Sequence, residues 1–129
     1  MLDTDVCVFF MDRTRPVLTE RILRHRTSEL CISAITAAEL AFGVDLSEHR
    51  VKNEKRLNRL RDEIPVAAFD SGAGDAYGAI RAHLHRRGAL LGPLDMLIAA
   101  HAKALGATLV TYNEREFRRV PGLKVERWA

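Results

Sequence analysis

The sequence contains few cysteines and no long apolar segment, and both shortages exclude classes of protein. Its 129 residues include only two cysteines, Cys7 and Cys31. Two cysteines are too few for a cysteine-based zinc site, and they fit small buried side chains better than a disulfide. No apolar run approaches the roughly 18–20 residues needed to span a bilayer. Residues 1–12 carry acids where a signal peptide would carry positive charge, so we expect a cytoplasmic protein.

What the sequence does contain indicates one globular domain. Hydrophobic residues make up 47% of the chain and charged residues 29%, which is the balance of a folded protein rather than a disordered one. The length suffices for one hydrophobic core. No internal repeat, low-complexity tract or linker divides the chain, so residues 1–129 are predicted to form a single domain.

Segments typical of short strands alternate with segments typical of helices. The expected strands end near Asp3 or Thr4 and cover residues 29–33, 66–69, 108–111 and 123–125. The expected helices start at Pro16, after Ser33, near residue 51, at Asp70 or Ser71, at Pro93 and near residue 114. This alternation predicts an α/β fold, an α/β/α sandwich whose central, mainly parallel sheet has four or five strands.

Helical spacing also predicts which side chains face the core. His101 lies on the apolar face of the helix that starts at Pro93, and we interpret it as a core residue rather than a metal ligand. In the helix after Ser33, the residues expected to be buried are Ile35, Ala38, Phe42 and Leu46.

Four carboxylates fall on four separate segments, where strands are expected to end. Asp3 ends the first strand, and Glu39 lies in the second turn of the helix after the second strand. Asp95 lies in the first turn of the helix from Pro93, and Glu116 follows the strand at 108–111. Ligands bind beyond the carboxyl ends of parallel strands, so we expect these acids to share one pocket. Oxygen ligands without Cys or His suit Mg²⁺ or Mn²⁺, which can activate water against a phosphate.

Each of these acids also has a structural interpretation. Thr36 and Glu39 match the S/T-x-x-E capping box, in which the glutamate satisfies backbone donors. Asp95 could favour the helix dipole, Asp3 could cap a turn, and Glu116 could be an ordinary surface residue. Three further acids are interpreted as helix-start residues: Asp5, Asp70 and Asp75.

The net charge is +3, and the basic residues are unevenly distributed. Such patches can neutralise phosphates, although each could equally be a solvated helix face. The three clusters are Arg50, Lys52, Lys55, Arg56, Arg59 and Arg61; His83, His85, Arg86 and Arg87; and Arg115, Arg118 and Arg119.

Four motifs, in this order, resemble the PIN-domain ribonucleases and, within that family, the VapC toxins of bacterial type II toxin–antitoxin systems. They are LDTD at 2–5, SAITAAEL at 33–40, PLDMLIAAHA at 93–102 and LVTYNEREFRRVPGLKVERW at 109–128. The resemblance implies Mg²⁺- or Mn²⁺-dependent endoribonuclease activity. Our hypothesis for the mechanism is that a metal-activated water attacks the phosphodiester and leaves a 5′-phosphate and a 3′-hydroxyl. The resemblance also implies a homodimer, and a VapB-type antitoxin whose C-terminal segment covers the active groove.

The resemblance further implies roles for individual residues. The first three family acids correspond to Asp3, Glu39 and Asp95, which would hold the metal and carry out catalysis. Many relatives have Asp where this sequence has Asn113, a candidate metal ligand, and Glu116 matches a further catalytic acid. The residues implied to line the pocket are Thr4, Asp5 and Thr111. The candidates for contacts with RNA are Arg86, Arg87, Arg118 and Arg119.

Other functions are compatible with parts of the pattern. A non-catalytic domain of the same fold could bind RNA or a protein partner without cutting, and a metal-dependent DNase or flap-type nuclease would share the acids. A phospho-acceptor receiver domain has the same α/β class and paired acids after its first strand. It also needs a lysine after a late strand, whereas the only lysine near the final strand is Lys124, within it.

Overall fold

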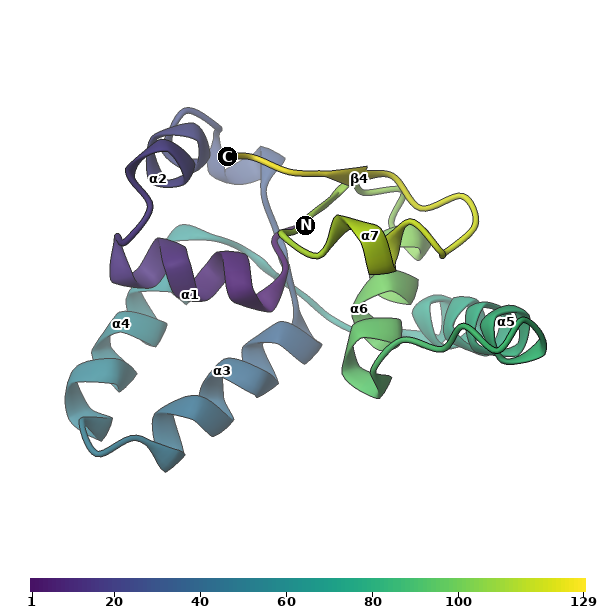
Figure 1. The fold of residues 1–129 in the computed structure, drawn as a ribbon. Helices are drawn as coiled ribbons and strands as arrows, with labels where there is room; N and C mark the ends of the chain where they lie inside the picture. The colour runs from purple at the N-terminus through teal and green to yellow at the C-terminus, as the bar shows by residue number, and fades with distance from the viewer.

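Five short extended segments run parallel through the centre of the computed structural model, which describes residues 1–129 (Figure 1). Strand β1 (Ile32–Ser33) pairs with β2 (Val66–Ala67), and β3 (Leu109–Val110) pairs with β4 (Val125–Glu126). Leu2 connects the two pairs, because it forms a parallel bridge with Val110 and its N–H donates to the Cys31 carbonyl at 2.9 Å. The expected parallel arrangement is confirmed, although regular pairing covers only two residues in each strand.

The order of these segments locates a binding site. Numbered along the chain, with Leu2 in the first, they lie in the order 3-2-1-4-5. A receiver domain has the order 2-1-3-4-5, so that alternative is wrong. The order reverses between the first and fourth segments, and ligands of open α/β sheets bind beyond the strand ends at such a point. Asp3 and Thr111 are the residues that follow these two segments.

Helices cover both sides of the extended segments. Helices α1 to α4 gather on one side, and α5 and α6 on the other, with α7 above α6 in the view of Figure 1. This arrangement confirms the expected α/β/α layering. The bounds are α1 (Thr4–Asp12), α2 (Pro16–Leu23), α3 (Ala34–Leu46), α4 (Arg50–Glu63), α5 (Ser71–Arg86), α6 (Pro93–Ala104) and α7 (Glu114–Phe117). None of these helices combines the length and apolarity that crossing a bilayer requires.

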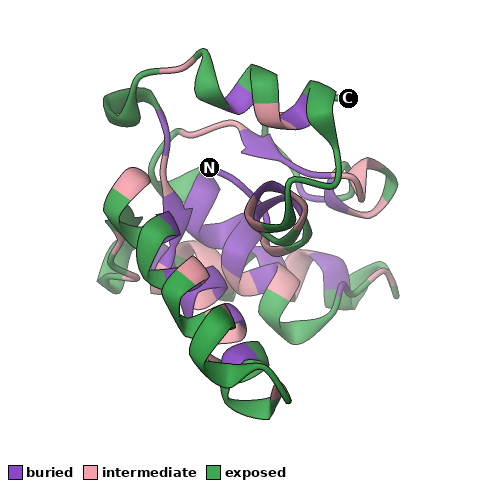
Figure 2. Ribbon diagram, turned by 90° about the vertical axis from the view of Figure 1, so that its left-hand side faces the viewer, coloured by how far each residue is buried: buried purple, intermediate pink, exposed green.

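Two hydrophobic clusters correspond to the two helical layers. One joins α1 to α4 with Leu2 and β1, and its largest buried members include Phe10 and Leu60. The other joins α5, α6 and α7 with β3 around Ile98 and Phe117. Figure 2 shows the buried residues on the strands and the inner helix faces, with exposed residues outside. Burial of these apolar faces holds the helices against the sheet and so fixes the strand ends.

Local capping signals place the helices where the sequence predicts them. Pro16 and Pro93 stand at the first position of α2 and α6, and the side chains of Ser33 and Asp70 cap α3 and α5. Gly88 follows α5 with a φ of +62°, a left-handed conformation that suits glycine. Each of these residues fixes its helix end through contacts within a few residues of the chain.

Two predictions are wrong, one about the strand expected at residues 29–33 and one about the buried face of α3. The strand expected at 29–33 is reduced to β1, because residues Thr27–Glu29 form a 3₁₀ turn closed by the Glu29 side chain, which accepts from the Arg26 N–H at 2.8 Å. In α3, Phe42 and Leu46 are 67% and 72% exposed. The face that packs in the core instead carries Thr36, Ala37, Leu40 and Val44. The helix is apolar around most of its circumference, so spacing alone did not identify its inner face.

His101 lies in the core, as predicted. Its side chain is buried, its Nδ1 lies 2.7 Å from Ser33 Oγ, and its ring packs edge-on against Phe69. Burial lowers the pKa of His101, which favours the neutral imidazole. The residue therefore links α6 to β1 inside the protein.

Candidate active site

Asp3 lies buried at the point where the strand order reverses. Its Oδ1 accepts from the Thr4 N–H at 2.7 Å, and its Oδ2 accepts from the Thr111 hydroxyl at 2.7 Å. Burial raises the pKa of Asp3, and the charges of Asp5 and Glu39 act in the same direction, whereas the two hydrogen bonds oppose the rise. Asp3 also caps α1, so the structural interpretation of this residue is correct, and the same carboxylate belongs to the pocket.

Glu39 faces the same pocket from α3. Its Oε1 accepts from the Thr4 hydroxyl at 2.8 Å, and that hydroxyl lies 3.1 Å from Thr36 Oγ1. The capping-box interpretation of Thr36 and Glu39 is wrong, because Ser33 is the residue that caps α3. Thr36 is a site residue that the sequence reasoning missed. Its spacing from Glu39 was the available signal, since residues three apart share a helix face.

Asn113 and Glu116 lie at the turn that follows Thr111 and begins α7. The Asn113 amide nitrogen donates to Glu116 Oε2 at 2.9 Å. The Asn113 backbone N–H donates to the Thr111 hydroxyl at 2.9 Å. Because Thr111 in turn donates to Asp3, its side chain connects the first segment of the sheet to the turn that begins α7.

Asp95 in the first turn of α6 completes the group. Its pKa is raised to about 6, first by burial and then by the charges of Asp3, Glu39, Glu116 and Asp5. Because their charges act on Asp95, these four carboxylates lie within electrostatic range of it. The structure thus brings carboxylates of four separate segments into one neighbourhood. We call this group the acid cluster, and its members are Asp3, Asp5, Glu39, Asp95 and Glu116.

No side chain of the protein neutralises the acid cluster. The ion pairs of the chain all involve other carboxylates. The cluster offers only oxygen donors, and no three carboxylates converge closely enough to enclose an ion by themselves. This donor set fits a hard divalent cation such as Mg²⁺ or Mn²⁺, which keeps part of its water shell and is bound by a few carboxylates.

The hydroxyl of Thr111 provides a test of this fit. Thr111→Val keeps the volume of the buried side chain but removes the donor to Asp3 and the acceptor for Asn113. We expect the affinity for Mn²⁺ to fall about tenfold, since groups that orient a metal ligand commonly contribute this much. Calorimetric titration with Mn²⁺ measures the change, and Thr27→Val, at an exposed threonine, is the matched control. An unchanged affinity in a folded Thr111→Val protein would contradict the assignment.

The candidate arginines lie outside the acid cluster. Arg86 and Arg87 end α5 in exposed positions, and Arg119 is exposed after α7. Arg118 donates to Glu114 at 2.7 Å, so its charge is already partly compensated. These residues come from two separate elements, and their contact with RNA stays a prediction.

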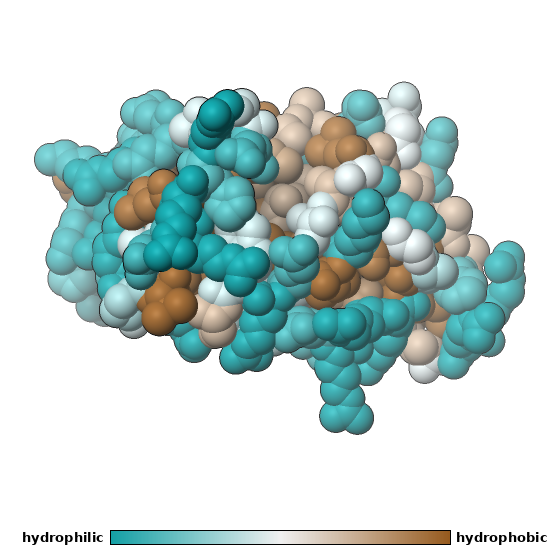
Figure 3. All heavy atoms as spheres, turned by 90° about the horizontal axis from the view of Figure 1, so that it is seen from above, coloured by the Kyte–Doolittle hydropathy of each residue, from teal (hydrophilic) through white to brown (hydrophobic).

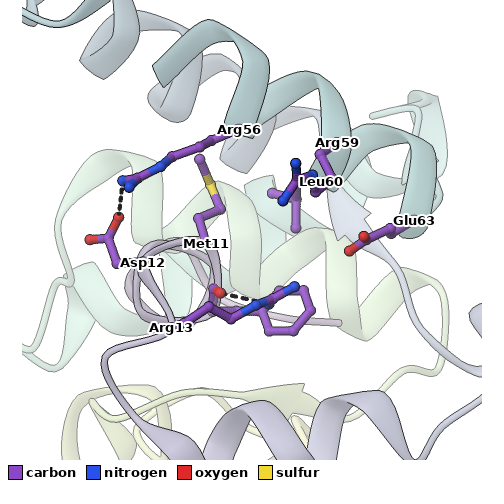
Figure 4. Close-up of a pocket in the computed structure, with 8 residues that line it drawn as sticks. Met11, Asp12, Arg13, Arg56, Arg59, Leu60 and Glu63 are labelled. Carbon is purple, nitrogen blue, oxygen red and sulfur yellow. Dashed lines mark hydrogen bonds and ion pairs between the residues drawn. The ribbon is translucent and has the colours of Figure 1, made fainter. Parts of the chain in front are cut away.

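A groove opens from the acid cluster between α1, α3 and α4. It begins at Thr4 and Glu39, has a volume of about 320 Å³, and ends at the ion pair between Asp12 and Arg56, whose charged atoms are 3.0 Å apart. The apolar residues along it are Val8, Leu40, Val44 and Met11. Beyond the ion pair lies a second pocket of about 210 Å³, lined by Arg13, Arg59 and Glu63 among others (Figure 4). The part of the groove next to Glu39 is therefore apolar, and the surface near Arg56 and Arg59, farther from the acids, carries positive charge.

The chain is similar to known proteins over almost its whole length. The PIN domain family model matches residues 1–123. The chain is 36% identical over 129 residues to the tRNA(fMet)-specific endonuclease VapC of Shigella flexneri, with 100% of this chain and 97% of that protein covered.

Two solved structures are similar in fold and in sequence. The structure of DNA-bound VapBC from Salmonella typhimurium matches with a TM-score of 0.95 and 38% identity, covering 100% of this chain and 97% of that one. The structure of VapBC2 from Rickettsia felis, bound to a DNA fragment from their promoter, matches with a TM-score of 0.93 and 32% identity, covering 100% and 98%. These similarities include every segment that contributes an acid to the cluster.

Proposed function

Because this chain belongs to the PIN-domain family, among the VapC-type ribonucleases, we propose that it is the endoribonuclease toxin of a toxin–antitoxin pair. Its acid cluster is the catalytic site in this proposal. The observation that carries the proposal is the hydrogen-bonded arrangement of acids from separate segments, in which Thr111 donates to Asp3, Thr4 to Glu39 and Asn113 to Glu116. No protein cation forms an ion pair with these carboxylates, and the raised pKa of Asp95 agrees with this arrangement. Uncompensated acids of this kind are typical of sites that bind a divalent cation.

The residues of the cluster have separate tasks in the proposed reaction. A bound Mg²⁺ or Mn²⁺ supplies positive charge against the scissile phosphate and makes water more acidic. Asp3, Glu39 and Asp95 would hold the ion, and the hydroxyls of Thr111 and Thr4 orient the first two carboxylates. Attack of water on phosphorus leaves a 5′-phosphate and a 3′-hydroxyl.

Two further residues complete the proposed set of oxygen donors. Asn113 holds Glu116 through its amide nitrogen, so the two side chains act as a pair. Asp5, in the first turn of α1, adds negative charge that acts on Asp3 and Asp95. Glu116 thus supplies a carboxylate beside Asn113, whose own side chain has none.

The groove beside the acid cluster suits a protein partner. We assign it to a VapB-type antitoxin, in keeping with the VapBC complexes among the similar structures. Its apolar wall accepts apolar side chains, and an occupant with a positive charge at the Glu39 end would neutralise the acids. The exposed outer face of α3, with Phe42 and Leu46, is our candidate for contact with a second copy of the chain.

Expression in growing bacteria tests the proposed function. We expect the wild-type chain to arrest growth and to create new RNA 5′ ends, and we expect Asp3→Ala to do neither. Asp75→Ala removes an exposed acid on α5 and is the matched control, which should behave as wild type. Purified protein incubated side by side with RNA and DNA separates a ribonuclease from a DNase. Arrest by Asp3→Ala at equal protein levels, or arrest without new RNA ends, would refute the proposal.

A further inference from the structure

Aromatic rings and arginines form a cluster on the side of α1 that faces the β3–α7 turn. The rings of Phe9 and Tyr112 pack edge-on with their centroids 5.4 Å apart. The guanidinium carbon of Arg15 lies 4.0 Å from the centroid of Phe9 and 4.5 Å from that of Tyr112. The guanidinium carbon of Arg127 lies 4.9 Å from the Tyr112 centroid. We call Phe9, Arg15, Tyr112 and Arg127 the cation–aromatic cluster.

This cluster adjoins the acid cluster at two points. Tyr112 stands in the chain between Thr111, which donates to Asp3, and Asn113, which donates to Glu116. Phe9 follows Asp5 by four residues on α1, so the two side chains share a helix face about 6 Å apart along the axis. The two rings therefore lie on the same segments as part of the acid cluster, namely α1 and the turn between β3 and α7.

The two arginines carry charges that no acid of the protein compensates. Arg15 and Arg127 are exposed, and neither takes part in an ion pair. Several other exposed arginines pair with a carboxylate: Arg24, Arg50, Arg56 and Arg118. Arg127 belongs to the C-terminal tail, which ends beside α2 in Figure 1. Figure 3, seen from above, shows a face on which hydrophilic residues are mixed with apolar patches. Both guanidinium groups lie over the Tyr112 ring, which holds them in position while their charges remain available to an anion from outside the protein.

The Tyr112 hydroxyl is a second, independent observation. The ring is partly exposed, yet its hydroxyl oxygen is shielded from solvent and has no hydrogen-bond partner. Buried polar groups in proteins are nearly always paired. A ligand that displaces a covering side chain and supplies a donor or acceptor would satisfy this hydroxyl.

We propose that the cation–aromatic cluster is a subsite that stacks an unpaired base of the RNA next to the scissile phosphate. The inference rests on the proposed ribonuclease function. The acid cluster repels the phosphates on either side of the cut, so a bound strand needs positive charge close by, and Arg15 and Arg127 supply it. Unpaired bases stack on aromatic rings and on guanidinium planes, and both are present here.

A fluorescent base in the RNA tests the subsite. The full chain with Asp95→Asn serves as the background, so that the RNA stays intact, and 2-aminopurine is placed at successive positions of a single-stranded RNA. Stacking quenches its fluorescence, and we expect quenching at a position adjacent to the cleavage site that the wild-type chain produces. Arg15→Lys keeps the charge and removes the planar group, and Tyr112→Leu removes the ring. Each is expected to abolish this quenching and to weaken RNA binding about tenfold.

The controls separate stacking from other roles. Arg24→Lys changes an exposed arginine on α2 that pairs with Glu20, and it should leave quenching and affinity unchanged. Arg15 is exposed, so Arg15→Lys keeps the test decisive even if Tyr112→Leu disturbs the fold. Quenching that persists in Arg15→Lys overturns the subsite and leaves the proposed function standing. Loss of antitoxin binding with RNA binding intact would assign the cluster to a protein partner and also overturns it. A wild-type chain that neither binds nor cleaves RNA overturns both proposals.

Discussion

Asp95→Asn is expected to slow RNA cleavage in Mn²⁺ at least about a hundredfold, because it removes a charged oxygen from the group that holds the cation. Residues that only orient metal ligands contribute about ten- to a hundredfold, so a ligand itself should contribute no less. EDTA should abolish the activity of the wild-type chain. A discontinuous assay with a defined single-stranded RNA measures both effects.

The same substitution is expected to stabilise the metal-free protein. Asp95 ionises against burial and four neighbouring carboxylates, and asparagine removes that charge at nearly constant shape. The pKa rise to about 6, discounted because the side chain is only half-buried, corresponds to about 1–2 kcal/mol. We expect the thermal midpoint in EDTA near neutral pH to rise by about 5 °C.

Asp75→Asn is the control for both measurements, since Asp75 is exposed on α5. It should change neither the cleavage rate nor the thermal midpoint. An Asp95→Asn protein with wild-type cleavage, or wild-type cleavage that EDTA does not affect, would refute the metal-dependent mechanism. A lower midpoint in EDTA would show that Asp95 is a structural acid.

The affinity for Mn²⁺ is expected to rise about thirtyfold between about pH 4.5 and pH 7.5. With a pKa of about 6, Asp95 is about 3% ionised at the lower pH and about 97% ionised at the higher. A cation binds the ionised form and displaces the proton. The raised pKa of Asp3 acts in the same direction and adds to the effect.

The stability of the metal-free protein should change in the opposite direction. The folded protein holds the Asp95 proton up to about pH 6, whereas the unfolded chain releases it near the ordinary value of 3.8. Between these values the folded state binds more protons, so the free energy of unfolding falls as the pH rises. Thermal melts in EDTA and in Mn²⁺ across this range measure both trends. Asp95→Asn should remove most of the pH dependence, and an equal dependence in the variant would contradict the assignment.

The sequence predicted those features that depend on local chemistry. Ser33, Asp70 and Pro93 mark helix starts because their side chains or rings act on backbone within a few residues. Asp3 and Glu39 could be placed at strand ends because a parallel sheet brings those ends to one edge.

The remaining features depend on contacts between distant segments. Thr36 and Glu39 have a spacing that fits either a cap or a shared helix face, and only the approach of Thr4 from α1 decides between them. The contact of Phe9 with Tyr112 joins residues about a hundred positions apart, and no periodicity reports it. The inner face of α3 could not be chosen, because its outer face, with Phe42, is apolar as well.

The central place of Leu2 in the sheet has a consequence for how the protein is made. Leu2 pairs with Val110, and Asp3 accepts its hydrogen bond from Thr111, which is 108 residues away. The residues around Leu2 must therefore wait for the segment around Thr111 before these contacts can form. Contacts this distant in sequence form late, after most of the chain is available. A nascent chain thus lacks an assembled site until the segment around Thr111 has been made and has reached Asp3, and the ribosome that makes it is not exposed to its activity before then.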